Sequence, residues 1–230
     1  MREIVLDTET TGVDAESDRI VEIGCVELVN SFPTGRTKQY YINPERPCSR
    51  GAFEVHGLSD EFLAKQPVFS AIVEDFCDFV GDARLVIHNA SFDVAFLNAE
   101  FRRCGKPAIE QHTVVDTLAL ARRKHTGASN SLDALCQRYG IDNAKRTKHG
   151  ALLDSELLSE VYIELMGGKQ ADLALAAVTV TSIVATDGGA VIRAPRPFVS
   201  RLTDEERAAH LAFIATLGEK AIWRNYVRGE

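Results

Sequence analysis

The sequence predicts an α/β fold, a mixed sheet of about five strands flanked by helices, followed by a C-terminal linker and a helical tail. Three observations support this prediction. Short apolar runs near the N-terminus follow one another with brief connections, as antiparallel strands do. From about residue 69, helical periodicity alternates with short buried runs, which indicates strands joined by helical crossovers. Beyond residue 168 the composition shifts to Ala, Val and Thr, interrupted by Gly and Pro.

Length and composition limit the class of protein. The 230 residues are 45% hydrophobic and 26% charged, which excludes a collagen-like, mainly disordered or coiled-coil chain. No apolar run reaches the roughly 18 residues of a membrane span, and the N-terminus lacks the apolar stretch of a signal peptide. We therefore expect a cytoplasmic protein without a membrane partner. The five cysteines include no C-x-x-C pair, which argues against a disulfide framework or a zinc site.

The first three strands are expected at residues 4–10, 19–29 and 38–42. The first is an apolar run that ends at Thr11-Gly12, and Pro44 follows the third. Each connection is too short for the crossover that a parallel pair requires, so the three strands should form an antiparallel meander.

Helix and strand then alternate. Apolar side chains at helical spacing predict helices at 70–80 and 92–104, and short buried strands are expected at 85–87 and 114–115. Further helices are expected at 117–124, 131–139 and 151–166, after which Gly167-Gly168 ends the pattern. We therefore assign residues 1–168 to one domain.

Two carboxylates stand at the end of the first strand. Asp7 and Glu9 are two residues apart, so both side chains lie on one face. Like charges at a buried edge raise each other's pKa unless a cation neutralises them, and oxygen ligands without cysteine favour Mg²⁺ or Mn²⁺. Alone, the pair would fit a solvated strand end equally well.

Further candidate ligands begin later elements. Asp93 starts the helix after the strand at 85–87, on the sheet edge that Asp7 reaches. His149 lies on a loop, and Asp154 lies one turn into the next helix. Four carboxylates and a histidine in such places predict a site for two divalent ions. Bound cations would also let a chain of net charge −7 hold a polyanion.

Five motifs occur in order along the first domain. They are D-T-E-T-T-G at 7–12, V-H-G at 55–57, H-N-A-S-F-D at 88–93, N-S-L-D-A-L at 130–135 and I-D-N-A-K-R-T-K-H-G-A-L-L-D at 141–154. With these motifs, residues 1–168 resemble the DEDDh family of 3′–5′ exonucleases. The His-x-x-x-x-Asp spacing of the last motif separates this branch from relatives that have a tyrosine there. The resemblance implies a ribonuclease-H-like fold, which agrees with the strand order predicted above.

The resemblance also implies a role for each residue of the site. Four carboxylates would be catalytic and hold two divalent ions, Mg²⁺ or Mn²⁺: Asp7, Glu9, Asp93 and Asp154. His149 would be the general base, and Thr10 and His56 would contact the substrate together with Asp7, Glu9 and Asp154. The expected reaction releases nucleoside 5′-monophosphates from the 3′ end of DNA.

Two basic clusters lie near the predicted site. Lys145, Arg146 and Lys148 precede His149, and residues 122–124 follow the fifth strand. These clusters fit two interpretations equally well: they contact the phosphates of a nucleic acid, or they form an ordinary solvated surface. Contact would offset the acidic net charge locally.

The remaining residues predict attachment to other proteins. Residues 169–202 form a linker or small appendage, or a hairpin around residues 187–189. Gln170, Leu173 and Leu175 resemble the anchors by which bacterial replication proteins bind the sliding clamp, with a plain helical continuation as the alternative. Thr203 opens a capping-box pattern, and residues 203–230 resemble in position the segment by which proofreading members bind the polymerase subunit.

These observations favour a proofreading exonuclease bound to a replicative DNA polymerase. A free-standing DEDDh exonuclease for RNA or oligonucleotides has the same chemistry, although the long tail argues against it. A tether with an inactive site is a third interpretation, against which the complete set of catalytic residues argues.

Overall fold

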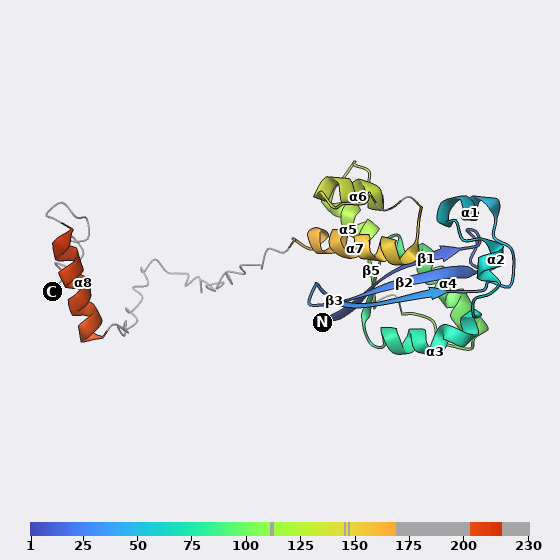
Figure 1. Cartoon of the computed structure of the whole chain (residues 1–230), viewed down its shortest axis with the longest axis horizontal. Coiled ribbons are helices and arrows are strands. Elements are labelled where there is room, and N and C mark those ends of the chain that lie inside the picture. Colours follow the sequence, from blue (N-terminus) through green and yellow to red (C-terminus); the bar gives the residue numbers. More distant parts are fainter. Residues whose placement is uncertain (111–112, 145, 147, 169–202, 218–230) are drawn as a thin grey trace, which may run out of the picture. The chain divides into compact units, whose positions relative to one another are not determined.

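The computed structural model describes residues 1–110, 113–144, 146, 148–168 and 203–217. The chain divides into two compact units, Met1–Leu175 and Ala176–Glu230, and each is described by itself (Figure 1). The predicted linker at 169–202, its candidate clamp anchors and the end of the tail lie outside the described residues. Within the described residues, no helix is long and apolar enough to cross a membrane.

The first unit is built on a five-stranded mixed sheet, as predicted. Its strands are β1 (Arg2–Thr10), β2 (Ile20–Val29), β3 (Phe32–Tyr41), β4 (Arg84–Ile87) and β5 (Val114–Asp116). Their order in the sheet is β3-β2-β1-β4-β5. Strand β2 pairs antiparallel with both β1 and β3. Strand β4 pairs parallel with β1, and β5 pairs parallel with β4. Strand β3 is longer than predicted, because Phe32–Thr37 pairs with β2 although its side chains are exposed and give no apolar signal.

Seven helices of the first unit surround the sheet in the described part of the chain. They are α1 (Arg50–His56), α2 (Asp60–Leu63), α3 (Phe69–Val80), α4 (Ala90–Arg103), α5 (Thr117–Lys124), α6 (Leu132–Tyr139) and α7 (Ala151–Leu165). The sequence did not predict α1 and α2. Each buries a single residue, so neither has an apolar period to detect, and each starts at a serine cap, Ser49 or Ser59.

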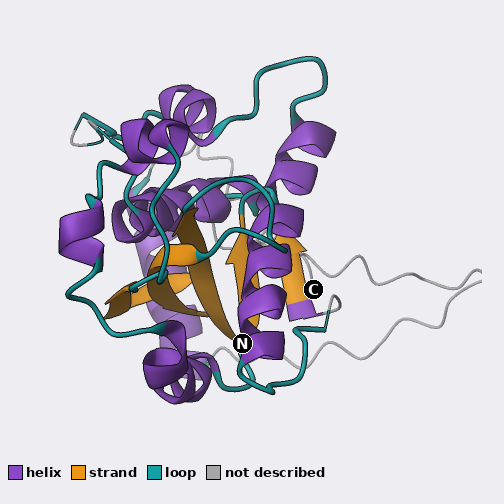
Figure 2. Ribbon diagram, turned by 90° about the vertical axis from the view of Figure 1, so that its right-hand side faces the viewer, coloured by secondary structure: helices purple, strands orange, loops and turns teal. Residues whose placement is uncertain are grey.

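The helices cover both faces of the sheet (Figure 2). Helices α3 and α4 pack on one face, where Ile4 and Leu6 of β1 meet Phe76 and Phe96. On the other face, α7 packs with Leu158 against Val5. Residues of β1 therefore alternate between the two cores, and Asp7 and Glu9 follow Val5 toward α7.

The start of α7 lies directly against β2. A Cβ atom at Gly24 would lie 2.2 Å from the backbone of Ala151, so only glycine permits this approach. The Ser155 hydroxyl, which is buried, donates a hydrogen bond to the Gly24 carbonyl at 3.0 Å. This contact fixes the first turn of α7, and with it Asp154, over the end of the sheet that carries Asp7.

Among its described residues, the second unit contains α8 (Asp204–Thr216). The predicted capping box is present: the Thr203 side chain accepts from the Glu206 backbone, and the Glu206 side chain accepts from the Thr203 backbone. Leu211 and Phe213 are exposed, whereas Ile214 is buried.

Candidate active site

Strand β1 delivers two carboxylates to one edge of the sheet. Asp7 lies opposite Gly24 of β2, and Glu9 lies opposite Glu22. Asp7 is half-buried and Glu9 is buried. Burial raises the pKa of Glu9 to about 8. Burial also raises the pKa of Asp7 well above its usual value, and the charges of Asp93 and Glu9 add to this increase.

Helix α4 brings Asp93 to the same edge. The turn from β4 into α4 passes through Asn89, whose φ of 65° lies in the left-handed region that asparagine tolerates. Asp93 is buried in the first turn, where Oδ1 accepts hydrogen bonds from the Thr8 backbone at 3.1 Å and the Thr8 hydroxyl at 2.7 Å. Burial raises the pKa of Asp93 to about 7 although the bonds from Thr8 favour the anion.

Asp154 and His149 come from α7 and the loop that precedes it. Asp154 is buried in the first turn of α7, and Nδ1 of His149 lies 3.3 Å from its Oδ2. The backbone N–H of His149 donates to the Val55 carbonyl at 3.2 Å, which ties the loop to the end of α1. One ligand atom each from Glu9, His149 and Asp154 lie within 4.8 Å of one another.

Arg146 occupies a place that the sequence did not predict. Its guanidinium donates to both oxygens of Asp154 at 2.6 and 2.7 Å and to Asp133 at 2.7 Å, and its side chain is 7% exposed. Arg146 is therefore neither solvated nor free to bind phosphate in this structure, contrary to both interpretations above. Burial would raise the pKa of Asp154, but the hydrogen bonds from Arg146 and His149 outweigh it and lower that pKa. The bond to Asp154 raises the pKa of His149.

The two predicted substrate contacts, Thr10 and His56, lie near each other at the end of β1. The Thr10 hydroxyl donates to the Gly12 carbonyl at 2.6 Å. His56 ends α1, and its Nδ1 accepts from the Leu58 backbone at 3.0 Å. Burial lowers the pKa of His56, with partial compensation by the Thr10 backbone, so the ring is neutral. Its Nε2 has no hydrogen-bond partner within the described part of the chain.

The donor set fits divalent cations. Three buried or half-buried carboxylates have raised pKa values because the folded chain disfavours their anions: Asp7, Glu9 and Asp93. A cation bound among them would reverse this penalty, and clustered carboxylate oxygens are typical ligands of hard ions such as Mg²⁺ or Mn²⁺.

Sequence reasoning missed the supporting residues of this site. Thr8 points away from Asp7, to the opposite face of β1, and there holds Asp93. The sequence did contain an indication of this role: Thr8 lies between Asp7 and Glu9 on a strand whose side chains alternate between the two faces. Arg146 gave only a charge signal, because its partners Asp133 and Asp154 lie on different helices.

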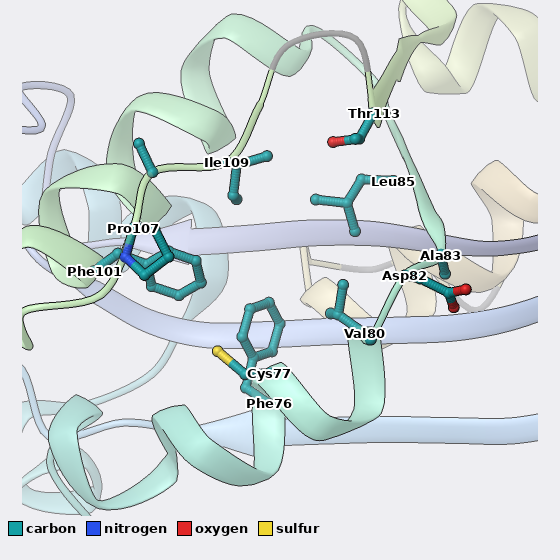
Figure 3. Close-up of a pocket in the computed structure, with 12 residues that line it drawn as sticks. Phe76, Cys77, Val80, Asp82, Ala83, Leu85, Phe101, Pro107, Ile109 and Thr113 are labelled. Carbon is teal, nitrogen blue, oxygen red and sulfur yellow. The ribbon is translucent and has the colours of Figure 1, made fainter.

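An apolar pocket of about 210 Å³ lies away from the carboxylates (Figure 3). Side chains from α3, β4 and the end of α4 line it, among them Phe76, Val80, Leu85 and Phe101. None of the predicted site residues lines this pocket. This apolar cavity is therefore separate from the predicted site.

Comparison with known proteins identifies the family. Residues 4–162 match the exonuclease family. The chain belongs to this family. It is 43% identical over 222 residues to the DNA polymerase III subunit epsilon of Rickettsia felis, covering 94% of this chain and 97% of the relative. It is 44% identical over 237 residues to the subunit of the same name from Escherichia coli K12, covering 97% of each.

Solved structures agree with this assignment. Exonuclease X in complex with 5′ overhanging duplex DNA matches with a TM-score of 0.54 at 26% identity, covering 71% of this chain and 90% of that one. The zinc-bound complex of Escherichia coli exonuclease I with single-stranded DNA has a TM-score of 0.62 at 16% identity, covering 71% and 40%, and shows the fold alone. The predicted ribonuclease-H-like fold and 3′–5′ exonuclease class are confirmed. Exonucleases of this family depend on divalent metal ions.

Proposed function

We propose that this exonuclease removes nucleotides from DNA 3′ ends as the proofreading subunit of DNA polymerase III. The observation that carries the proposal is the identity of 43–44% to epsilon subunits over 94–97% of the chain, which includes most of the tail. A free-standing exonuclease would need similarity only in the catalytic domain, so the comparisons do not favour that alternative. We also place the protein in the cytoplasm, where replication occurs in bacteria.

The proposed mechanism assigns a task to each residue of the site. Two divalent ions, Mg²⁺ or Mn²⁺, would be held by Asp7, Glu9, Asp93 and Asp154. When bound, they supply the positive charge that stabilises the attacking and leaving oxygens of an in-line displacement at phosphorus. Thr8 holds Asp93 in place through its two hydrogen bonds.

His149 acts as the general base. Its Nδ1 lies 3.3 Å from Oδ2 of Asp154, and an Nδ1–H that donates to this carboxylate leaves Nε2 to accept the proton of the attacking water. The ring is half-exposed, so water and substrate can reach it. His56, whose buried Nε2 has no hydrogen-bond partner among the described residues, would contact the terminal nucleotide together with Thr10.

The tail would attach the enzyme to its partners. We assign residues 203–230 to binding of the polymerase alpha subunit and Gln170, Leu173 and Leu175 to the sliding clamp. The exposed Leu211 and Phe213 of α8 support the first assignment, since an amphipathic helix binds a partner groove through such side chains. Truncation after Gly168 should leave cleavage intact and abolish co-purification with the alpha subunit. Undiminished co-purification would refute this role of the tail.

The chemistry is tested by digestion of matched 5′-labelled single-stranded DNA and RNA with Mg²⁺ or EDTA, comparing wild type with His149→Ala. The expected result is a Mg²⁺-dependent ladder that shortens from the 3′ end of DNA and is lost in the variant. Preference for RNA would instead support the alternative function in RNA turnover. Cleavage that persists in EDTA would contradict the metal-dependent mechanism.

A further inference from the structure

A surface pocket of about 560 Å³ lies beside the carboxylate site and shares none of its residues. It is formed by the end of β4, by α5 and by the loop between α5 and α6. Its lining includes His88, Leu118, Arg122, Thr126, Asn130 and Ser131. The described residues that line it include no carboxylate, and its volume falls in the range of about 300–1,000 Å³ that small ligands occupy.

The strand register places this pocket next to the proposed metal ligands. Val5 of β1 pairs with Val86 of β4, and both side chains pack beneath α7. Asp7 lies two residues beyond Val5, and His88, the first residue after β4, lies two residues beyond Val86. The contact of His88 with Thr117 of α5 keeps its ring on the face of the sheet that α5 and α7 cover. The pocket therefore begins one strand away from Asp7. Neither Thr10 nor His56 lines it, so it is separate from the proposed contacts with the terminal nucleotide.

Arg122 gives the pocket a cation without a protein partner. The side chain is exposed, and its guanidinium makes no ion pair or hydrogen bond with any residue that the structure describes. Nearby cations are already used: Lys124 donates to the carbonyls of Glu164 and Leu165, and Arg146 binds Asp154. Arg122 is thus the basic residue of the pocket that is free to bind an anion.

The other polar residues suit a nucleotide. His88 lines the pocket; burial lowers the pKa of its ring, and Nδ1 lies 2.9 Å from the Thr117 hydroxyl. Asn130 is 9% exposed, and its amide nitrogen donates to the carbonyls of His125 and Ala128. Its Oδ1 has no partner among the described residues, and a buried acceptor of this kind needs a donor.

We propose that this pocket binds the DNA strand upstream of the scissile bond, with Arg122 on a backbone phosphate. The inference rests on the proposed DNA exonuclease function and adds a binding site to it. A strand whose last nucleotide lies at Thr10 and His56 continues away from them. A basic, carboxylate-free pocket next to Asp7 offers its phosphates a favourable path.

The test compares Arg122→Ala with Arg123→Ala on two substrates. Arg123 is the matched control, since it is also exposed and basic but does not line the pocket. The substrates are a 5′-labelled single-stranded DNA and the p-nitrophenyl ester of thymidine 5′-phosphate, which has no upstream nucleotide. Arg122→Ala should lower kcat/KM on DNA by about tenfold, mainly through KM, and leave the ester within about twofold. Arg123→Ala should leave both within about twofold.

Two further measurements, the salt dependence of KM and the effect of a neutral phosphate analogue in the DNA, show whether Arg122 contacts a phosphate. Loss of one phosphate contact should reduce the slope of log KM against log salt by about 0.7. In wild type, one neutral methylphosphonate upstream of the scissile bond should weaken cleavage as much as Arg122→Ala does, and should add nothing in that variant. Equal losses on DNA and ester, equal effects of both arginine variants, or additive effects of the methylphosphonate would overturn the inference. Failure of wild type to cleave DNA would instead refute the proposed function itself.

Discussion

Buried carboxylates occur in two regions of the first unit, and their partners differ. Outside the candidate active site, Glu100 is 1% exposed and accepts hydrogen bonds from Arg19 at 2.6 and 3.0 Å. Glu27 is similarly buried and pairs with Arg2 at 2.7 Å. In the candidate active site, Asp93 is equally buried at 3%, yet its hydrogen bonds come from uncharged Thr8.

The pKa values express this difference. Hydrogen bonds from Thr34 and Arg2 lower the pKa of Glu27, whereas burial raises the pKa of Asp7 and Glu9. Burial of a carboxylate therefore does not by itself indicate a site. The cluster of Asp7, Glu9 and Asp93, with raised pKa values and no cationic hydrogen-bond partner among the described residues, indicates one because a ligand has to supply the missing charge. Asp154 differs from them, since Arg146 binds both of its oxygens and its pKa is lowered.

The largest expected effect follows from removing a charge at the site. Asp7→Asn should reduce DNA cleavage by about 10³-fold or more, because it removes one of the proposed metal ligands. It should not lower the thermal midpoint of the metal-free protein, since one of several repelling anions is lost. Cleavage in Mg²⁺ and thermal unfolding in EDTA measure the two effects. More than a tenth of wild-type activity in the variant would contradict the assignment.

The matched change outside the candidate active site should lower stability and leave DNA cleavage unchanged. Glu100→Gln removes the buried charged partner of the part-buried Arg19 guanidinium, which keeps only the exposed Glu45, at 3.7 Å, as a charged partner among the described residues. We expect the free energy of unfolding to fall by about 3 kcal/mol, measured by urea denaturation. The cleavage rate of the folded variant should stay within about twofold of wild type. An unchanged unfolding midpoint would show that the buried pair contributes no stability.

The sequence predicted the strands and the long helices because each depends on local pattern, and the same pattern marked several candidate site residues. Asp7 and Glu9 interrupt an otherwise apolar strand, and Asp154 begins an apolar helix, so both are visible as exceptions to periodicity. Predicting the fold required only the order of these elements along the chain and the lengths of the connections between them.

What the sequence did not predict depends on contacts between distant elements. The bond from Thr8 to Asp93 joins residues 85 positions apart, and Arg146 links Asp133 and Asp154 from two helices. The short helices α1 and α2 bury one residue each and leave no pattern. Such features arise from packing, which a single sequence does not display.

Metal ions and pH provide a third test of the comparison. Because Glu9 and Asp93 have raised pKa values in the folded protein, the folded state binds more protons than the unfolded state between about pH 4 and pH 8. The stability of the metal-free protein should therefore fall as pH rises through this window. Mn²⁺ or Mg²⁺ at about 100 times its dissociation constant should add about 2.7 kcal/mol at pH 8 and less at pH 5. Thermal unfolding with and without metal at the two pH values measures this stabilisation. An equal stabilisation by metal at pH 5 and pH 8, or the same stabilisation in Asp7→Asn as in wild type, would contradict the proposed metal site.

The smallest expected effect lies on the same strand as the site. Glu3 shares a face of β1 with Asp7 and Glu9, but its Oε1 accepts a hydrogen bond from the Tyr162 hydroxyl at 2.9 Å, and both groups are buried. Tyr162→Phe removes this donor with little change of shape. The free energy of unfolding should fall by about 1–2 kcal/mol, because a buried acceptor loses its partner. DNA cleavage and the stabilisation by metal should not change, since Glu3 lies at the opposite end of the strand from the carboxylates that hold the ions. A loss of metal stabilisation in this variant would show that the two ends of β1 are coupled and that the distinction between partnered and unpartnered carboxylates is incomplete.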